Sequence, residues 1–192
     1  MWLYVLACQW KRISQEEAFV GRCGEVGDEL GSAVVCARLV RDLMRLVLLM
    51  ERRYPPYSKW LGSAFARTEA GPDLVPLMTA ALAATDWKTR ERELGRVYTR
   101  VAEQHNELGL TEPLDTSTRL YFDRPFQVIG AERFTGALLE RIEDAEIRAL
   151  SQAGAIDQFA DNTDFLGRAE FTRGAITTMI GDAWHARVAR LR

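Results

Sequence analysis

Residues 34–60, VVCARLVRDLMRLVLLMERRYPPYSKW, decide the fold. Apolar side chains recur at helical spacing through the first half of this stretch, and the pattern extends back to Arg22 and forward to Tyr54. Pro55-Pro56 ends it because proline cannot donate a helical hydrogen bond. We expect a second, short helix from Tyr57 to Phe65, with Pro56 in its first turn. The glycines at 24, 27 and 31 weaken the long helix, which predicts either close packing or a break near Gly27.

The same periodicity predicts further helices along the chain. They cover residues 2–13, 74–84, 87–108, 131–150 and 169–191. Ser14-Gln15-Glu16-Glu17 fits either a capping box that starts another helix or the interior of one long helix. Residues 111–130 contain Pro113, Asp115 and Pro125 and indicate extended chain. The predicted fold class is therefore all-α: a multi-helix bundle with one short extended connection around 111–130.

Length and composition favour one domain. The chain has 192 residues, 47% of them hydrophobic, which is enough for a real core. We predict a single helical accessory domain over 1–192, with sub-regions 1–110 and 111–192. The first helix already has Trp2 and Leu3 in its apolar stripe, so we expect an apolar face there that packs on another part of a longer protein.

Charge and cysteine usage exclude several classes of protein. The 25 basic and 27 acidic side chains nearly cancel, so no overall field attracts nucleic acid or a membrane surface. Cys8, Cys23 and Cys36 are odd in number and form no C-x-x-C pair, which argues against a disulfide framework or a zinc site. Residues 34–50 carry four charges and fail as a membrane span. These features predict a cytoplasmic protein, and the strong excess of arginine over lysine is typical of bacteria with GC-rich genomes.

An arginine stripe is the first candidate binding feature. Arg38, Arg41 and Arg45 lie three and four residues apart, which places them on one helix face that continues to Arg52. The stripe is either the solvated face of an amphipathic helix or a row of guanidinium groups that holds phosphate or carboxylate.

The proline corner after this helix is the second candidate. It concentrates three cations and three aromatic rings, which can neutralise phosphate and stack on a flat ring. Alternatively, its aromatic residues belong to the core and fix the corner. The predicted ligand-binding residues are Arg41, Arg45, Arg52, Arg53, Tyr54, Tyr57, Lys59 and Trp60. We predict no catalytic residue and no metal ligand in this chain.

Two groups of acidic residues and one histidine are weaker candidates for a functional site. The acidic groups are Glu25, Asp28 and Glu29, and Asp157, Asp161 and Asp164. Each group fits either a divalent cation or solvated surface. The spacing of Arg100 and His105 is that of some metal-independent ribonucleases, but five helical residues turn these side chains about 140° apart. A structural histidine is the alternative.

Five segments resemble one family. They are WLYVLACQWKRISQEEAFVGRCGEVGDELGS (2–32), RLVRDLMRLVLLMERRYPPYSKWLGSAFA (38–66), LGLTEPLD (108–115), FDRPFQVIGAERF (122–134) and DQFADNTD (157–164). Together they resemble the C-terminal helical region of bacterial proteins with the domain of unknown function 4037 (DUF4037). Longer members of that family place a nucleotidyltransferase-like domain before this region, which implies that the helical region is an accessory domain.

The residues for nucleotidyl transfer are missing from this chain. The transferase half of the family implies a Gly-Ser turn followed by paired acids that hold magnesium and a triphosphate. Here Gly62-Ser63 lies in a helical pattern, and the next acid, Glu69, has no acidic partner two residues on. We therefore expect this chain to bind no cofactor by itself. Magnesium and a nucleoside triphosphate would belong to a transferase domain.

Three functional hypotheses follow. The first is an accessory or substrate-binding domain whose partner is a nucleotidyltransferase-like domain, upstream or on another chain, with self-association as a further expectation. The second is a non-catalytic interaction or regulatory module that packs on a partner through an exposed apolar face. The third is a small metal-independent ribonuclease, which requires Arg100 and His105 to converge. Neither nucleic acid nor a membrane is an expected partner of the first two.

Overall fold

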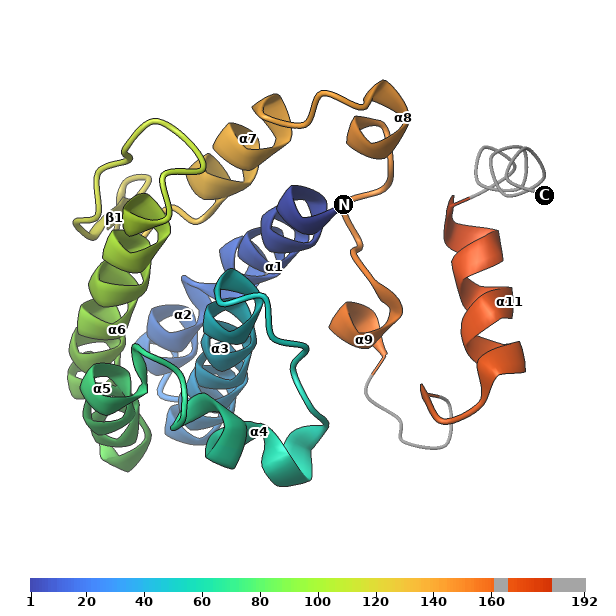
Figure 1. The fold of residues 1–192 in the computed structure, drawn as a ribbon. Helices are drawn as coiled ribbons and strands as arrows, with labels where there is room; N and C mark the ends of the chain where they lie inside the picture. The colour runs from blue at the N-terminus through green and yellow to red at the C-terminus, as the bar shows by residue number, and fades with distance from the viewer. Residues whose placement is uncertain (161–165, 181–192) are drawn as a thin grey trace, which may run out of the picture.

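A computed structural model describes residues 1–160 and 166–180 and shows a mainly helical protein (Figure 1). Helix α3 (Glu29–Met50) packs against α1 (Trp2–Glu16), α2 (Phe19–Glu25), α4 (Ser58–Phe65), α5 (Gly71–Ala83) and α6 (Trp87–Glu107). Helix α7 (Glu132–Glu140) packs on α1. The predicted all-α fold class is confirmed. Helix α11 (Ala169–Ile180) contacts α9 (Ile156–Phe159) on the side of the bundle opposite α6.

The expected break near Gly27 separates α2 from α3. Gly27 has a φ of +79°, a conformation that glycine adopts at little cost. The Asp28 side chain then accepts a hydrogen bond from the Gly31 amide at 2.7 Å and caps α3. Helix α1 continues through Ser14 to Glu16, and the Ser14 hydroxyl donates to the Lys11 carbonyl at 2.7 Å. Ser14 therefore caps no helix, and the capping-box interpretation is wrong.

Two helices that begin near prolines start at residues other than those predicted. Helix α4 begins at Ser58 after Tyr57 in an extended conformation, so Pro56 lies outside it. Helix α5 begins at Gly71, three residues earlier than expected, because Pro72 fits the first turn of a helix, where no amide donor is needed. Helix α6 ends as predicted, with Gly109 at a φ of +61° just beyond it.

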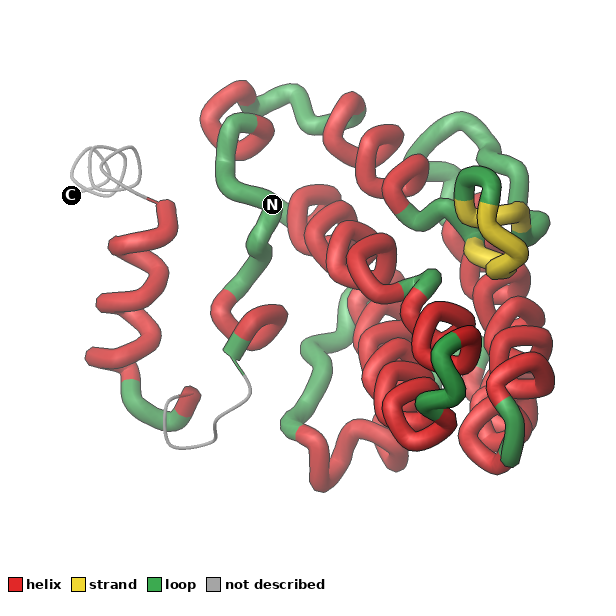
Figure 2. Tube along the Cα trace, turned by 180° about the vertical axis from the view of Figure 1, so that it is seen from behind, coloured by secondary structure: helices red, strands yellow, loops and turns green. Residues whose placement is uncertain are grey.

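The predicted extended connection contains a short β-hairpin. Strand β1 (Arg119–Tyr121) pairs antiparallel with β2 (Arg124–Val128), with Arg119 opposite Val128 and Leu120 opposite Gln127. The hairpin packs against α6 through β2 (Figure 2). Phe126 and Val128 alternate into the core at this contact.

The prediction of one helix over 131–150 is wrong, because α7 ends at Glu140 and a separate helix follows. Helix α8 (Ala145–Arg148) begins anew where the Asp144 side chain accepts hydrogen bonds from the amides of Glu146 and Ile147, at 3.0 and 3.2 Å. The last predicted helix begins at Ala169 as expected. Its portion from residue 181 onward lies outside the described residues.

One hydrophobic core joins both sub-regions of the chain. Leu6, Trp10 and Ile13 of α1 are fully buried, and the Trp10 ring stacks on Phe134 of α7 with centroids 4.3 Å apart. Trp2 is only partly buried, against this core. Among the helices of the described residues, none is both long and apolar enough to cross a membrane.

Candidate functional site

The C-terminal end of α3 forms the corner predicted from the sequence. Arg53 donates its amide hydrogen to the Leu48 carbonyl at 2.8 Å, and Arg52 adopts a positive φ of 57°. This turn places the Arg52 guanidinium 4.1 Å from the centroid of the Trp2 ring. The Trp2 indole in turn donates to the Leu49 carbonyl at 2.7 Å. Cation–π contact and hydrogen bond together fix Arg52 over the start of α1.

A pocket of about 380 Å³ opens beside this corner. It is lined by Met1, Trp2, Val5, Leu49, Arg52, Arg53, Tyr54, Ala155 and Asp157. Three of the eight predicted ligand-binding residues, Arg52, Arg53 and Tyr54, are therefore brought together. We name this cavity the corner pocket.

Arg45 lies behind the corner pocket in a buried ion pair. Its Nη2 is 2.8 Å from Oδ2 of Asp157 and also donates to the Asp157 main-chain carbonyl. Only 8% of the Arg45 side chain and 9% of the Asp157 side chain are exposed. Desolvation, followed by the charge of Asp157, raises the pKa of the nearby Tyr54 phenol above its usual value. Arg45 therefore neutralises the one carboxylate that lines the corner pocket.

Arg41 and Arg38 are also paired with acids. Asp42, 1% exposed, lies 3.5 Å from the Arg41 Nε and 2.8 Å from the Arg12 Nε. Arg38 donates to both carboxylate oxygens of Glu16. Burial raises the pKa of Asp42, and the neighbouring arginines oppose this effect. Within the stripe, Arg38 therefore joins α3 to α1 and Arg45 joins α3 to α9 through ion pairs, whereas Arg41 pairs with Asp42 of α3 itself.

The remaining predicted residues lie on the outer surface around the start of α4. Tyr57 and Trp60 are 50% and 51% exposed, and the Lys59 ammonium lies 5.0 Å from the Trp60 ring centroid. Tyr54 is 71% exposed. The alternative that these three aromatic residues are core residues is therefore wrong. Tyr57, Lys59 and Trp60 are not among the residues that line the corner pocket.

The three residues of the first acidic group have partners within the protein. Glu25 pairs with Arg124, Asp28 caps α3, and Glu29 lies 3.1 Å from Arg90. Over residues 1–160 and 166–180, no cluster of three His, Cys, Asp or Glu side chains has the arrangement to hold a metal ion. Asp161 and Asp164 lie outside the described residues.

His105 is a core residue. It is 0% exposed, its Nδ1 accepts a hydrogen bond from the Trp10 indole at 3.2 Å, and its Nε2 lies 3.3 Å from the Thr111 hydroxyl. Burial lowers its pKa to about 4, so the ring is neutral at pH 7. Arg100 lies 3.1 Å from Glu107. This geometry supports the structural alternative, because a fully buried ring cannot reach a phosphodiester.

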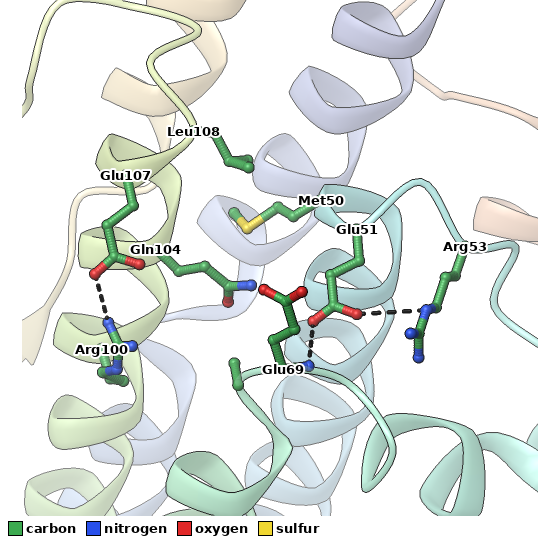
Figure 3. Close-up of a pocket in the computed structure, with 9 residues that line it drawn as sticks. Met50, Glu51, Arg53, Glu69, Arg100, Gln104, Glu107 and Leu108 are labelled. Carbon is green, nitrogen blue, oxygen red and sulfur yellow. Dashed lines mark hydrogen bonds and ion pairs between the residues drawn. The ribbon is translucent and has the colours of Figure 1, made fainter.

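Sequence reasoning missed a second pocket, on the other side of Arg53. It has a volume of about 440 Å³ and is lined by Met50, Glu51, Arg53, Glu69, Ala70, Arg100, Gln104, Glu107 and Leu108 (Figure 3). These residues come from the end of α3, the α4–α5 loop and the last turns of α6. No spacing along the chain indicates the site, since its members are up to 58 positions apart. We name it the α3–α6 pocket.

Comparison with known proteins gives one match. No curated protein and no solved structure matches the chain. Residues 1–61, which contain α1, α2, α3 and the whole corner, match the family model of a domain of unknown function, DUF4037.

Proposed function

We propose that this chain is a helical accessory or substrate-binding domain that works with a nucleotidyltransferase-like domain, in the same protein or on a partner chain. Its part is to hold an anionic group of the substrate in the corner pocket. Nucleotidyl transfer, with magnesium and the triphosphate, would take place on the transferase domain. One observation carries the proposal: the match to DUF4037 over residues 1–61 includes all eight predicted ligand-binding residues, and three of them line one pocket.

The charges of the corner pocket support an anionic ligand. Arg45 neutralises Asp157, and Arg53 has Glu51 as a partner at 3.4 Å. The Arg52 guanidinium lies over the Trp2 ring, and among the described residues it forms no ion pair with a carboxylate. Its guanidinium can therefore donate paired hydrogen bonds to phosphate or carboxylate. The Trp2 ring and Leu49 add apolar surface beside it.

Titration calorimetry with AMP tests this proposal. We expect AMP to bind the wild-type chain and Arg52→Gln to weaken binding by about 1 to 3 kcal/mol, the scale for losing a charge-assisted hydrogen bond. Arg141→Gln, at the exposed end of α7, removes the same charge away from the pocket and should change nothing. Equal affinities for both variants would contradict the proposal.

A label-transfer assay tests whether this chain alone catalyses nucleotidyl transfer. With magnesium and labelled nucleoside triphosphates, the chain alone should label no acceptor above the blank. Turnover that a point substitution in this chain abolishes would contradict the assignment of chemistry to another domain.

A non-catalytic interaction module is the second candidate. Leu30 and Val34 are 78% and 53% exposed and lie one turn apart on α3, and Val26, at the end of α2, is 78% exposed. Such a surface favours contact with a partner or a second copy. Dimers at micromolar concentration in sedimentation experiments, together with no AMP binding, would favour this candidate over the first.

A further inference from the structure

The chain between the end of α3 and the end of α4 exposes flat rings and cations together. In Figure 1 it leaves α3 as an extended connection and continues into α4. Its three aromatic side chains outside the core are each at least half exposed, and such a cluster marks a contact site. Residues 52–68 contain four cations and no acidic side chain, although basic and acidic side chains nearly cancel over the whole chain. We name Tyr54, Tyr57, Lys59, Trp60 and Arg67 the α4 surface.

Prolines hold two of these rings on one side of the chain. Pro55 and Pro56 fix their own φ at about −65°, and Tyr57 has a φ of −63° and a ψ of 164°, close to polyproline II geometry. This conformation repeats every three residues and rises about 3.1 Å per residue, so Tyr54 and Tyr57 lie on one side, about 9 Å apart. Pro55 is buried, whereas both tyrosines are exposed. The backbone that carries both rings is therefore ordered before a ligand binds.

The cations of the α4 surface can pair with an anionic partner. The Lys59 ammonium lies 5.0 Å from the centroid of the Trp60 ring, and it forms no ion pair within residues 1–160 and 166–180. Over the same ranges no ion pair involves Arg67, which follows the end of α4. Arg53 donates from Nη1 to the Arg67 carbonyl at 2.9 Å, which brings a further guanidinium to this end of the helix.

Rings beside cations favour single-stranded nucleic acid over other anionic partners. Aromatic rings stack on unpaired bases, and cations pair with the phosphates between those bases. A duplex keeps the faces of its bases inside its own stack, and a run of carboxylates would pair with the cations but leave the rings without a flat partner. The nearly neutral charge of the whole chain gives no long-range attraction, so binding has to come from this local surface.

We propose that the α4 surface binds single-stranded nucleic acid, with bases stacked on Tyr57 and Trp60 and phosphates paired with Lys59 and Arg67. Of the α4 surface, only Tyr54 also lines the corner pocket. The inference therefore goes beyond the proposed function and does not depend on it.

Fluorescence anisotropy with labelled strands of about ten nucleotides on the full chain tests the proposal. Oligothymidylate DNA and oligouridylate RNA are the two probes, and binding of either one supports it. Three competitors should displace the strand at least about tenfold less effectively: a duplex of the same length, an oligoglutamate peptide, and vesicles of anionic phosphatidylglycerol. If any competitor is as effective as an unlabelled strand, or if neither strand binds, the proposal is overturned.

The dependence on salt measures how many phosphates are neutralised. Each phosphate paired by a protein cation contributes a slope of about −0.7 to log K against log salt for single strands. Two or three such pairs should lower the affinity for oligothymidylate about three- to fourfold whenever the salt concentration doubles. An affinity that does not change with salt would contradict the pairing of phosphates with Lys59 and Arg67.

Substitution of one ring locates the bound strand. Trp60→Leu keeps an apolar side chain on α4 but removes the flat ring, and it should weaken oligothymidylate binding about tenfold, the scale of one lost stacking contact. Phe122→Leu removes an exposed ring of the hairpin and should change nothing. Equal affinities for these variants would overturn the assignment. AMP binding should be the same in Trp60→Leu as in the wild type, because Trp60 does not line the corner pocket, so this test and the test of the proposed function can fail separately.

Two lysines provide a second matched comparison. Each lies beside a tryptophan in the first turn of a helix, Lys59 in α4 and Lys88 in α6. Lys59→Gln should weaken oligothymidylate binding about three- to tenfold and reduce its dependence on salt, whereas Lys88→Gln should do neither. If the two variants behave alike, the strand does not bind at α4 and the proposal fails. Thermal melting checks that each variant is folded, and if Trp60→Leu does not fold, the lysine comparison decides.

Discussion

Two buried titratable side chains give this protein opposing responses to pH. The neutral ring of His105 accepts a hydrogen bond from Trp10, and burial lowers its pKa to about 4. Glu17 accepts the amide hydrogens of Gly130 and Ala131, at 2.9 and 3.1 Å, at the start of α7. Burial raises its pKa to about 7 in spite of these hydrogen bonds. The two groups titrate in overlapping ranges of pH, so the wild-type profile alone does not separate them.

Replacing His105 by asparagine separates the two effects. The folded pKa of His105 lies below the unfolded value of 6.5, so the unfolded chain binds the proton first as the pH falls. The wild type should therefore lose up to about 3 kcal/mol of stability relative to His105→Asn between pH 6.5 and 4. Glu17 acts in the opposite direction, because its raised pKa makes stability fall as the pH rises from about 4.5 to 7, but it is present in both proteins and cancels.

Urea unfolding at pH 7.5, 5.5 and 4.5 measures this difference. Asparagine keeps an acceptor near the position of Nδ1, so the Trp10 hydrogen bond can persist. A stability difference that stays constant over the three pH values would contradict the neutral, buried assignment of His105.

At the scale of single elements, periodicity predicted most of the helices. It failed where a local side chain, rather than a proline or glycine, divides a helix. The break after Glu140 is such a case, since Asp144 caps a new helix in a segment whose apolar spacing continues. Helix ends near Pro72 and Pro56 were also misplaced, because proline permits a helix start at more than one position.

The candidate site was predictable only in part for a related reason. Helical spacing placed Arg41, Arg45 and Arg52 close to one line, and the proline corner gathered Arg53 and Tyr54 beside them. The partner of Arg45 is Asp157, 112 positions away on α9. Nothing in the local pattern of either residue indicates that contact, which depends on how α9 folds back on α3.

The Arg45–Asp157 ion pair leads to a prediction about one element, because it holds α9 against the bundle. Arg45→Met leaves the Asp157 carboxylate buried without its charge partner, which costs about 3 to 5 kcal/mol in comparable sites. Because α9 is a single helix of four residues, the cost should appear as local opening rather than global unfolding. Adding Asp157→Leu to Arg45→Met should restore much of the loss, because no charge then remains buried.

Hydrogen exchange followed by mass spectrometry distinguishes local from global effects. In Arg45→Met, amides of residues 155–159 should exchange at least tenfold faster, whereas those in the middle of α6 should exchange as in the wild type. Equal acceleration in α9 and α6 would show that the pair stabilises the whole bundle instead of holding one element.

At the scale of the whole molecule, the two predicted sub-regions share one core. Residues 129–138 contribute Ile129, Ala131, Phe134 and Leu138 to the same cluster as α1, α3 and α6. The hairpin and α7 thus cover surfaces of α1, α2 and α6 that residues 1–110 alone would expose. The single domain predicted over 1–192 stays a prediction, which the melting experiment below tests. The shared core explains why Trp10 and Ile13 of α1 are fully buried, while Trp2, at the corner pocket, is not.

A single core predicts that the helices melt together, and Phe134 is the residue at which to test it. Its ring is fully buried between Trp10, at 4.3 Å, and His105, at 5.0 Å between centroids. Phe134→Ala should destabilise the protein by about 3 to 5 kcal/mol, since the cavity adds to the lost burial. Phe122→Ala, at a position 83% exposed on the hairpin, should change stability by less than about 0.5 kcal/mol. Tryptophan fluorescence reports on the surroundings of the five tryptophans, of which Trp10 is fully buried against Phe134, and far-ultraviolet circular dichroism reports on all helices, so coincident melting curves identify one cooperative unit. In Phe134→Ala both curves should shift together to lower temperature. A fluorescence transition that moves while the circular dichroism transition stays would mean that α1 and α7 form a unit separate from α3, α5 and α6, and the single-domain prediction would be wrong.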